Sequence, residues 1–399
     1  MSVTTHNRSR VSGTEQPSLF YRSEVRQVIY QILLLVGLAF VLWWVANNVA
    51  ENLRRQNIAS GFDFLGRTSG FDISQSLISY SNVSTYGRAF WVGLLNTLLV
   101  SAIGIVFATV VGFIIGIARL STNWIIARLA TVYVEIVRNV PLLLQLFFWY
   151  YAVLKNLPPP RQSMLVTEGV FLNVRGLYLP APVAEPGFGA VLVALLFGIA
   201  ASIGLYFWAR QRQMRTGQQF PILWWSLGLI VGLPLVVYLA LGSPMYLEYP
   251  VLKGFNFQGG LVVLPEFLAL LLGLSIYTAS FIAEIVRAGI LGVPKGQKEA
   301  AMAVGLTTGQ TLRLVVIPQA ARIIIPPLTS QYLNLTKNSS LAVAVGYPDF
   351  VSVFTGTVLN QTGQAVEVIA MTMGVYLTIS LLTSAFMNWF NDRMALVER

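Results

Sequence analysis

Two tetrapeptides of this sequence place an acidic and a basic side chain three residues apart, Glu135-Ile-Val-Arg138 and Glu284-Ile-Val-Arg287. On a helix, residues at this spacing lie on one face and can form an ion pair. Both tetrapeptides adjoin long apolar segments, where an unpaired charge is costly, so we expect each pair to form. The pairs could act as a gate or could orient their helices, and we favour the second interpretation.

Few side chains are suited to covalent or metal chemistry. The sequence has no cysteine and one histidine, His6, in a polar N-terminal segment. The sequence therefore has almost no residues that could form disulfides, carry out thiol catalysis or build His-based metal sites. The sequence also lacks the G-x-x-x-x-G-K-[ST] phosphate loop of an ATPase; the run from Gly292 to Lys298 has neither its spacing nor its final Ser or Thr. We predict no catalytic residue, no metal site and no cofactor in this chain.

The composition indicates an integral membrane protein. Of the 399 residues, 55% are apolar and only 11% are charged, against about 25% charged in soluble proteins. A run of about 20 apolar residues spans a bilayer as a helix. The predicted fold is therefore all-α, with about eight spanning helices at roughly 28–48, 90–117, 125–153, 189–209, 221–241, 261–286, 321–345 and 366–389.

Three features modify this pattern of helices. Pro141 is expected to kink the third helix, and Pro326, Pro327 and a polar run make the seventh the least regular. The pairs Gly112/Gly116 and Gly228/Gly232 have the spacing that allows close helix approach. The connection 49–89 is expected to be a polar loop with a short interfacial helix, and 155–188 an extended, turn-rich loop.

The distribution of charge fixes an orientation. With the N-terminus in the cytoplasm, the inner segments carry 17 of the 26 basic residues and 7 of the 16 acidic ones. The opposite orientation would place most Lys and Arg outside, against the positive-inside tendency. We expect both termini to be cytoplasmic.

The stretch from Glu284 to Gly346 combines charged and small residues between apolar segments. Its first half holds six charged groups, which places it in water on the cytoplasmic side. Glu299-Ala300-Ala301 predicts one or two short helices with a smooth face, and Gly305 permits a left-handed stop between them. Such a loop is suited to lie in a groove of another protein.

This spacing resembles the EAA loop of ABC importer permeases. The family pattern is Glu-Ala-Ala, three residues, Gly, nine residues, then I-x-L-P; here Val315 and Ile317 of Val-Val-Ile-Pro318 replace the usual Ile and Leu. The flanking words GQKEAA, PQAARIIIPPL and LNLTKNSSLA are similar to the polar amino acid (histidine/glutamine-type) branch. The extra helices are similar to those of general L-amino-acid importer permeases.

The resemblance implies a five-helix type I ABC importer core and a coupling loop at 294–318 that contacts an ATPase. The coupling residues that it implies are Lys295, Gly296, Glu299, Ala300, Ala301, Gly305 and Pro318. The implied division is 1–89 (tail, first helix and periplasmic loop), 90–155 (first part of the core), 156–260 (inserted loop and two extra helices) and 261–399 (second part of the core).

Lys337 is an ammonium group within a predicted membrane helix. It must face a cavity, a partner charge or the transported solute, and neighbouring hydroxyls and amides could bind an amino acid's carboxylate or ammonium. Alternatively, Lys337 snorkels to an interface or fixes a helix break. The predicted substrate pathway comprises Gln145, Asn334, Lys337, Asn338 and Ser339.

The resemblance implies a permease subunit that moves polar L-amino acids across a bacterial inner membrane by ATP-driven alternating access. The implied partners are a second permease subunit, identical or paralogous, two ATPase subunits that bind ATP and Mg²⁺, and a periplasmic binding protein. Nucleic acid is not an expected partner. The alternatives are an ion-coupled secondary transporter, an ABC permease for another small zwitterionic or cationic solute, and a non-transporting membrane scaffold.

Overall fold

Long apolar helices dominate the structure, a computed structural model that describes residues 23–55 and 60–394. Within these residues, seven helices are long and apolar enough to cross a membrane, or eight if one bent pair counts as a span. This confirms the predicted all-α membrane fold. The seven are α1 (Ser23–Arg55), α2 (Tyr86–Ala118), α5 (Phe188–Thr216), α6–η6–α7 (Ile222–Leu227, Gly228–Gly232 and Leu233–Ala240), α8 (Pro265–Leu291), α11 (Ile317–Asn338) and α13 (Ala365–Met394).

The helices α2 and α8 form the most extensive helix pair. A Cβ atom on Gly112 would lie 2.6 Å from Ile282 Cβ, and one on Gly116 would lie 2.7 Å from the carbonyl oxygen of Ala283. The two backbones therefore approach at a distance that only glycine allows. This confirms the packing role predicted for Gly112 and Gly116.

Within the described residues Gly228 and Gly232 make no close helix contact, so the packing role predicted for them stays a prediction. A Cβ atom on either residue would meet no atom within 4 Å. In this helical hairpin Gly198 of α5 makes the close approach, against the backbone at Leu229. The spacing of two glycines does not say which face of a helix meets a neighbour, and here α5 lies on another face.

The predicted third helix is broken rather than kinked. The helix α3 (Trp124–Asn139) ends before Pro141, and the chain turns by 105° into α4 (Leu142–Phe147). It continues as η3 (Phe148–Val153) and η4 (Leu154–Asn156). Proline lacks an N–H and disfavours helical geometry in the residue before it, which explains the break at Val140–Pro141.

The loops predicted as extended contain small antiparallel sheets. The four-stranded sheet has the order β1-β2-β3-β8, and two further pairs are β4-β5 and β6-β7. In register, Phe171 pairs with Tyr178 and Leu177 with Val263. The strands are β1 (Met164–Thr167), β2 (Val170–Asn173), β3 (Gly176–Leu179), β4 (Ala181–Ala184), β5 (Met245–Glu248), β6 (Val251–Lys253), β7 (Asn256–Gln258) and β8 (Leu261–Val263).

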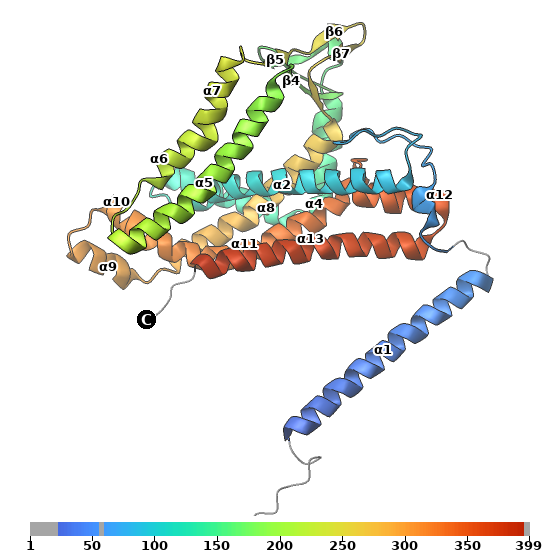
Figure 1. Ribbon diagram of the computed structural model, residues 1–399, viewed down its shortest axis with the longest axis horizontal. Helices are drawn as coiled ribbons and strands as arrows, with labels where there is room; N and C mark the ends of the chain where they lie inside the picture. The colour runs from blue at the N-terminus through green and yellow to red at the C-terminus, as the bar shows by residue number, and fades with distance from the viewer. Residues whose placement is uncertain (1–22, 56–59, 395–399) are drawn as a thin grey trace, which may run out of the picture.

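These strands lie at the opposite end of the molecule from the predicted coupling loop. The strand β8 directly precedes α8, and α9 (Lys295–Ala303) directly follows it. The length of α8 therefore separates the two, as Figure 1 shows. The pairing of β3 with β8 also joins the residues before α5 to those after α7, which closes the base of the α5–α7 hairpin.

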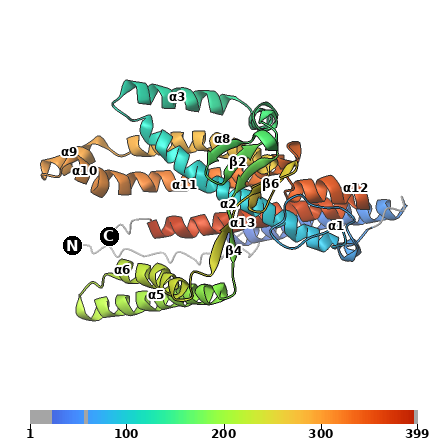
Figure 2. The same cartoon turned by 90° about the horizontal axis from the view of Figure 1, so that it is seen from above.

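Other segments surround the central helices. In Figure 2, α3 and the α5–α7 hairpin lie on opposite sides of α2, α8, α11 and α13. The helix α1 stands apart from them (Figure 1) and its apolar window is not buried. The connection after α1 includes the short helix η2 (Asp63–Gly66), as predicted for 49–89, although α1 itself continues to Arg55.

The predicted seventh helix begins earlier and is more continuous than its sequence suggests. The helix α11 runs without a break through Pro326 and Pro327 and is preceded by η7 (Leu312–Val316). Prolines are tolerated inside membrane helices because neighbouring helices and local changes of helix type satisfy the freed groups. After α11 the chain forms η8 (Ser339–Ala344), η9 (Val351–Val358) and α12 (Leu359–Thr362) before α13; η5 (Pro160–Gln162) precedes β1.

Candidate functional site

Two short helices project from the end of α8, where the coupling loop was predicted. The first, α9, ends at Ala303 with Val304 as its C-cap, and Gly305 follows with φ +86°. The N–H of Leu306 donates to the Ala301 carbonyl at 3.2 Å, and that of Gly305 donates to Met302 at 3.0 Å. This pair of bonds is a Schellman motif, which requires the left-handed residue that glycine provides. The predicted left-handed stop at Gly305 is confirmed.

The second short helix, α10 (Thr308–Thr311), begins with a capping box. The Thr307 hydroxyl accepts from the N–H of Gln310, whose side chain accepts from the N–H of Thr307. Two backbone N–H groups that have no partner within the helix, those of Thr307 and Gln310, are thereby satisfied. Local sequence signals thus fix the turn between α9 and α10.

Most predicted coupling residues lie at the surface. Lys295, Gly296, Glu299, Ala300, Gly305 and Pro318 are exposed, whereas Ala301 is buried. Two exposed apolar residues, Met302 and Val304, lie beside the charged ones. The Gln319 side chain of α11 donates to Gln297 of α9 at 3.4 Å, which ties the projecting helix to the bundle. The result is a mixed charged and apolar surface held on a short rigid helix.

A cluster of three charges lies in the last two turns of α8 and at the end of α2, before this projection. The Glu284 carboxylate accepts from Arg287 at 2.6 Å, which confirms that predicted pair. Its second oxygen accepts from Arg119 at the C-terminal cap of α2. The Arg119 side chain is only 10% exposed, so this pair is largely shielded from water. One carboxylate therefore holds two guanidinium groups and fastens α2 to α8.

The effect of these contacts is mechanical, because they join two helices. Glu284 joins α8 to α2 through Arg119, and the helix-orienting role of the Glu284–Arg287 pair stays a prediction. Arg119 was missed in the sequence because it lies 165 residues from Glu284. Its only sequence signal was its place at the end of an apolar run.

The predicted pair Glu135–Arg138 does not form. Among the described residues, neither side chain takes part in an ion pair. The Arg138 guanidinium instead lies 4.9 Å from the centre of the Phe281 ring on α8, a cation–π contact. The Tyr133 hydroxyl donates to the Ile276 carbonyl at 2.7 Å. The helix α3 is thus tied to α8 through its own aromatic and basic residues rather than by an internal pair.

Gln145 braces the break between α3 and α4. Its buried amide donates to the carbonyls of Val137 and Val140, both at 2.9 Å. These carbonyls lie at the end of α3, where the break at Pro141 removes their helical partners. Both amide hydrogens are used, so Gln145 can offer a solute only its oxygen.

The remaining residues of the predicted pathway lie on α11 and at the start of η8. Asn334 and Lys337 are exposed, Asn338 is half-buried and Ser339 is buried. The Ser339 hydroxyl donates to the Thr336 carbonyl at 2.7 Å. Lys337 lines a groove with residues of η9 and α13, whereas Gln145 lines a different cavity beside α3. The structure therefore does not bring the five residues into one cavity.

Asp349, a buried residue that the sequence did not single out, lies behind the Lys337 groove. Asp349 accepts from the Ser352 N–H at 2.8 Å and from the Tyr376 hydroxyl at 3.0 Å. Burial raises the pKa of the Asp349 carboxyl to about 7, against these hydrogen bonds, which lower it. Asp349 lies between the spanning segments Thr308–Ala344 and Ala365–Arg393. The Gly-Tyr-Pro-Asp word at 346–349 was its only signal.

Neighbouring residues fix the same region to α2. The Asn96 amide donates to the Pro348 carbonyl at 2.9 Å, and the Thr97 hydroxyl accepts from the Phe350 N–H at 2.9 Å. A Cβ atom on Gly93 would lie 3.1 Å from the Phe350 Cα, so α2 also approaches closely here. The chain around Asp349 is therefore held rigidly between α2 and α13.

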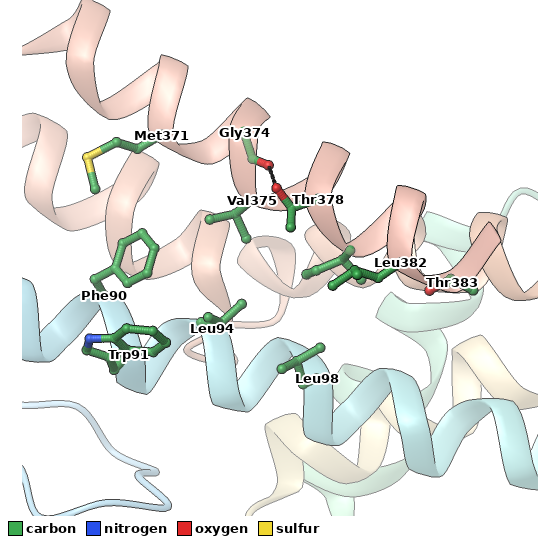
Figure 3. A pocket seen from close by; sticks show the side chains of 11 residues that line it. Phe90, Trp91, Leu94, Leu98, Met371, Gly374, Val375, Thr378, Leu382 and Thr383 are labelled. Atoms are coloured by element: carbon green, nitrogen blue, oxygen red, sulfur yellow. Dashed lines mark hydrogen bonds between the residues drawn. The ribbon is translucent and has the colours of Figure 1, made fainter. Parts of the chain in front are cut away.

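A larger cavity between α2 and α13 offers no polar chemistry. It has a volume of about 590 Å³ and is lined mainly by apolar side chains, as Figure 3 shows. The Thr378 hydroxyl, one of its few polar groups, already donates to the Gly374 carbonyl at 2.8 Å. None of the lining residues is charged. The cavity is unsuited to a polar solute, so size alone does not locate the site.

Comparison with known proteins identifies relatives of this arrangement. Residues 211–396 match the family model described as "Binding-protein-dependent transport system inner membrane component". This match includes α9, Glu284, Lys337 and Asp349.

Three curated proteins match nearly end to end. The "General L-amino acid transport system permease protein AapQ" of Rhizobium johnstonii is 58% identical, covering 97% of both chains. The "Putative amino-acid ABC transporter permease protein YhdX" of Escherichia coli K12 is 54% identical, covering 99% of this chain and 100% of the other. The "Glutamate/glutamine/aspartate/asparagine transport system permease protein BztB" of Rhodobacter capsulatus is 42% identical, covering 97% and 98%.

These matches confirm the resemblance noted in the sequence and disfavour the ion-coupled and scaffold alternatives. The exposed helical projection, the charge cluster behind it and the spanning helices all belong to the matched region. The chain belongs to the family of permease subunits of binding-protein-dependent ABC transporters.

Proposed function

We propose that this chain is the permease of an importer that moves polar L-amino acids across a bacterial inner membrane. The relatives are named for amino-acid transport, and the charge distribution favours a cytoplasmic location for α9 and both termini. Its partners would be a second permease subunit, two ATPase subunits and a periplasmic binding protein. ATP and Mg²⁺ would bind to the ATPases.

The observation that carries the proposal is the exposed projection of α9 and α10 at the end of α8. An exposed helix with apolar residues among charged ones, held by a Schellman turn, is suited to insert into a groove of a partner. The charge cluster near the end of α8, the helix that precedes α9, joins α8 to α2. A displacement of α9 by a closing ATPase would therefore move two core helices together.

Such coupling drives alternating access only if the ATPases contact α9 differently in their open and closed states. Solute would then pass beside α11, where Asn334, Lys337, Asn338 and Ser339 lie. Gln145, with both amide hydrogens used, would support the broken helix rather than contact the solute. We also propose that residues 156–260 form an insertion between the two parts of the core, with its sheets outside the membrane.

The test is copurification of the ATPase subunits with the full chain from native membranes. Glu299→Arg reverses the charge at the centre of α9 and is expected to abolish copurification and substrate-stimulated ATP hydrolysis. Glu168→Arg is the matched control, because Glu168 is equally exposed but lies between β1 and β2 at the opposite end. Loss of the ATPase in both variants, or in neither, would contradict the proposal.

A further inference from the structure

The hairpin of α5 and α6–η6–α7 has a one-sided distribution of charge. The sequence from 186 to 247 contains no acidic residue, and its three basic residues, Arg210, Arg212 and Arg215, all lie near the C-terminal end of α5. Among the described residues, none of these arginines takes part in an ion pair. This end of the hairpin therefore carries three positive charges that no carboxylate in the described part of the chain pairs with.

The same hairpin is exposed along most of its length. Its helices pack mainly against each other and lie beside the central helices (Figure 2). Only 17% of the apolar window of α5 and 6% of that of α6–α7 are buried. Helices that are apolar on nearly all sides belong in the hydrocarbon of a membrane. We therefore expect lipid to contact the exposed sides of the hairpin.

One side of α5 changes along the helix from apolar to aromatic to basic. The residues of this α5 stripe are, in order, Phe197, Ala201, Gly204, Trp208, Arg212 and Arg215. Successive members are three or four residues apart, so they lie on one side of the helix. Phe197 and Trp208 are exposed, and a Cβ atom on Gly204 would meet no atom within 4 Å. The apolar part of the stripe is therefore open to its surroundings.

The dimensions of the α5 stripe match one leaflet of a bilayer. Trp208 follows Phe197 by eleven positions, which is about 16 Å at 1.5 Å per residue. The hydrocarbon core of a bilayer is about 30 Å thick, and each leaflet contributes half of that. With Trp208 at the interface, where tryptophan is common, Phe197 lies near the middle of the membrane and the two arginines reach the headgroups.

Aromatic side chains position the basic end of the stripe. The Arg212 guanidinium lies 5.6 Å from the centre of the Trp208 ring and 5.9 Å from that of Phe220. It also donates to the Gln218 side chain at 3.2 Å, which uses only one of its five N–H donors. Arg215, almost one turn further on, is exposed. Two guanidinium groups on adjacent turns can bind the oxygens of one phosphate, a group that arginine recognises well.

We propose that Arg212 and Arg215 bind the phosphate of an anionic phospholipid, whose acyl chains lie along the stripe from Trp208 to Phe197. A zwitterionic lipid brings its own cation to the site, where two guanidinium groups are already present, so a lipid with net negative charge is favoured. A free phosphate ion would leave the apolar part of the stripe unused. The inference goes beyond the proposed transport function and does not depend on it.

The test measures phosphatidylglycerol binding to the purified full chain in detergent by native mass spectrometry, with phosphatidylcholine as the comparison lipid. The wild type is expected to bind phosphatidylglycerol about tenfold more tightly than phosphatidylcholine, because two basic residues face the headgroup. Arg212→Gln and Arg215→Gln are each expected to weaken phosphatidylglycerol binding about fivefold, the effect of one basic residue at an anionic surface. Because Arg215 is exposed, its replacement tests the site without disturbing the aromatic contacts of Arg212.

Arg210→Gln is the matched control, because it removes the same charge from the same end of α5. Arg210 precedes Arg212 by two positions and therefore lies about 200° around the helix from it, off the stripe. Its replacement is expected to leave phosphatidylglycerol binding within about twofold of the wild type, since a charge on the far side does not contact the headgroup. An equal loss in Arg210→Gln and Arg215→Gln would overturn the inference, because the arginines would then act only as a general positive charge.

Two further results would also overturn it. Equal binding of the two lipids by the wild type would show that the stripe does not select a negative headgroup. Displacement of phosphatidylglycerol by excess inorganic phosphate would assign the arginines to a free anion instead of a lipid. None of these measurements requires transport or an ATPase, so a failure here leaves the proposed function unaffected.

Discussion

At the scale of single residues, the charge cluster of Arg119, Glu284 and Arg287 shows how one carboxylate can hold two helices. Glu284 is shared, so the three positions are not equivalent. Removal of Arg119 leaves a complete Glu284–Arg287 pair, whereas removal of Glu284 leaves two guanidinium groups close together without an anion. Breaking a shielded pair costs more than its formation contributes, because the remaining charge is uncompensated.

We therefore expect Glu284→Gln to lower the thermal unfolding temperature of the purified protein more than Arg119→Gln. Hydrogen bonds to charged groups contribute about 1.5–3 kcal/mol each, and Glu284 accepts two of them. Arg128→Gln, an exposed arginine on α3, serves as the control and should have no effect. Intrinsic tryptophan fluorescence during heating is the measurement. An Arg119→Gln protein as unstable as Glu284→Gln would contradict the shared-carboxylate arrangement.

At the scale of elements, the contact of α2 with α8 is the central joint of the molecule. It combines the glycines of α2 with the charge cluster at the end that carries α9. Its closeness makes the joint stiff, since interiors are packed without spare volume. A movement of α9 can be transmitted to α2 only if the contact between α8 and α2 is stiff.

Gly116→Ala is expected to weaken this joint. The added Cβ would lie 2.7 Å from the Ala283 carbonyl oxygen and 2.8 Å from Val286 Cβ, so the helices must separate. Overpacking of this kind costs about 1–3 kcal/mol. Gly228→Ala is the matched control, because its Cβ would meet nothing within 4 Å, and in a helix alanine is favoured over glycine.

Thermal unfolding in detergent should show a lower midpoint for Gly116→Ala and an unchanged or higher one for Gly228→Ala. If coupling passes through this joint, substrate-stimulated ATP hydrolysis should fall in the first variant only. Equal behaviour of the two variants would show that α2 and α8 are less closely packed than described.

At the scale of the whole molecule, the sheets and the α9–α10 projection lie at opposite ends of the spanning helices. If α9 is cytoplasmic, as proposed, the sheets lie on the outer side, where the proposed periplasmic binding protein would arrive. The positive charges at the ends of α2 and α5 lie on the same side as α9, in agreement with the orientation inferred from the sequence.

This orientation can be measured with single cysteines, because the natural chain has none. Thr167→Cys on β1 and Ala303→Cys on α9 are both exposed positions. A membrane-impermeant maleimide should label only the first in intact spheroplasts and only the second in inverted vesicles. The reverse pattern would place the coupling helices outside and would refute the proposed topology.

The sequence by itself determined the features that consecutive residues encode. Spanning helices follow from apolar runs, and the α9–α10 turn follows from Gly305 and the Thr307 capping box. The orientation counted from the charges stays a prediction. The pair Glu284–Arg287 was also predictable, since it spans one helical turn. The division at 156–260 stays a prediction, because helix and strand assignments alone do not show which residues form one unit.

Only the tertiary structure decided which groups meet across the bundle. Arg119 pairs with Glu284 although 165 residues separate them. Arg138 follows Glu135 by three residues, as Arg287 follows Glu284, but it contacts the Phe281 ring instead. Gly112 and Gly116 pack closely, whereas Gly228 and Gly232 do not. The spacing of residues along one helix predicts only which side chains of that helix can contact each other. The actual partner of a side chain depends on which neighbouring helix covers its face, and no short stretch of sequence contains that information.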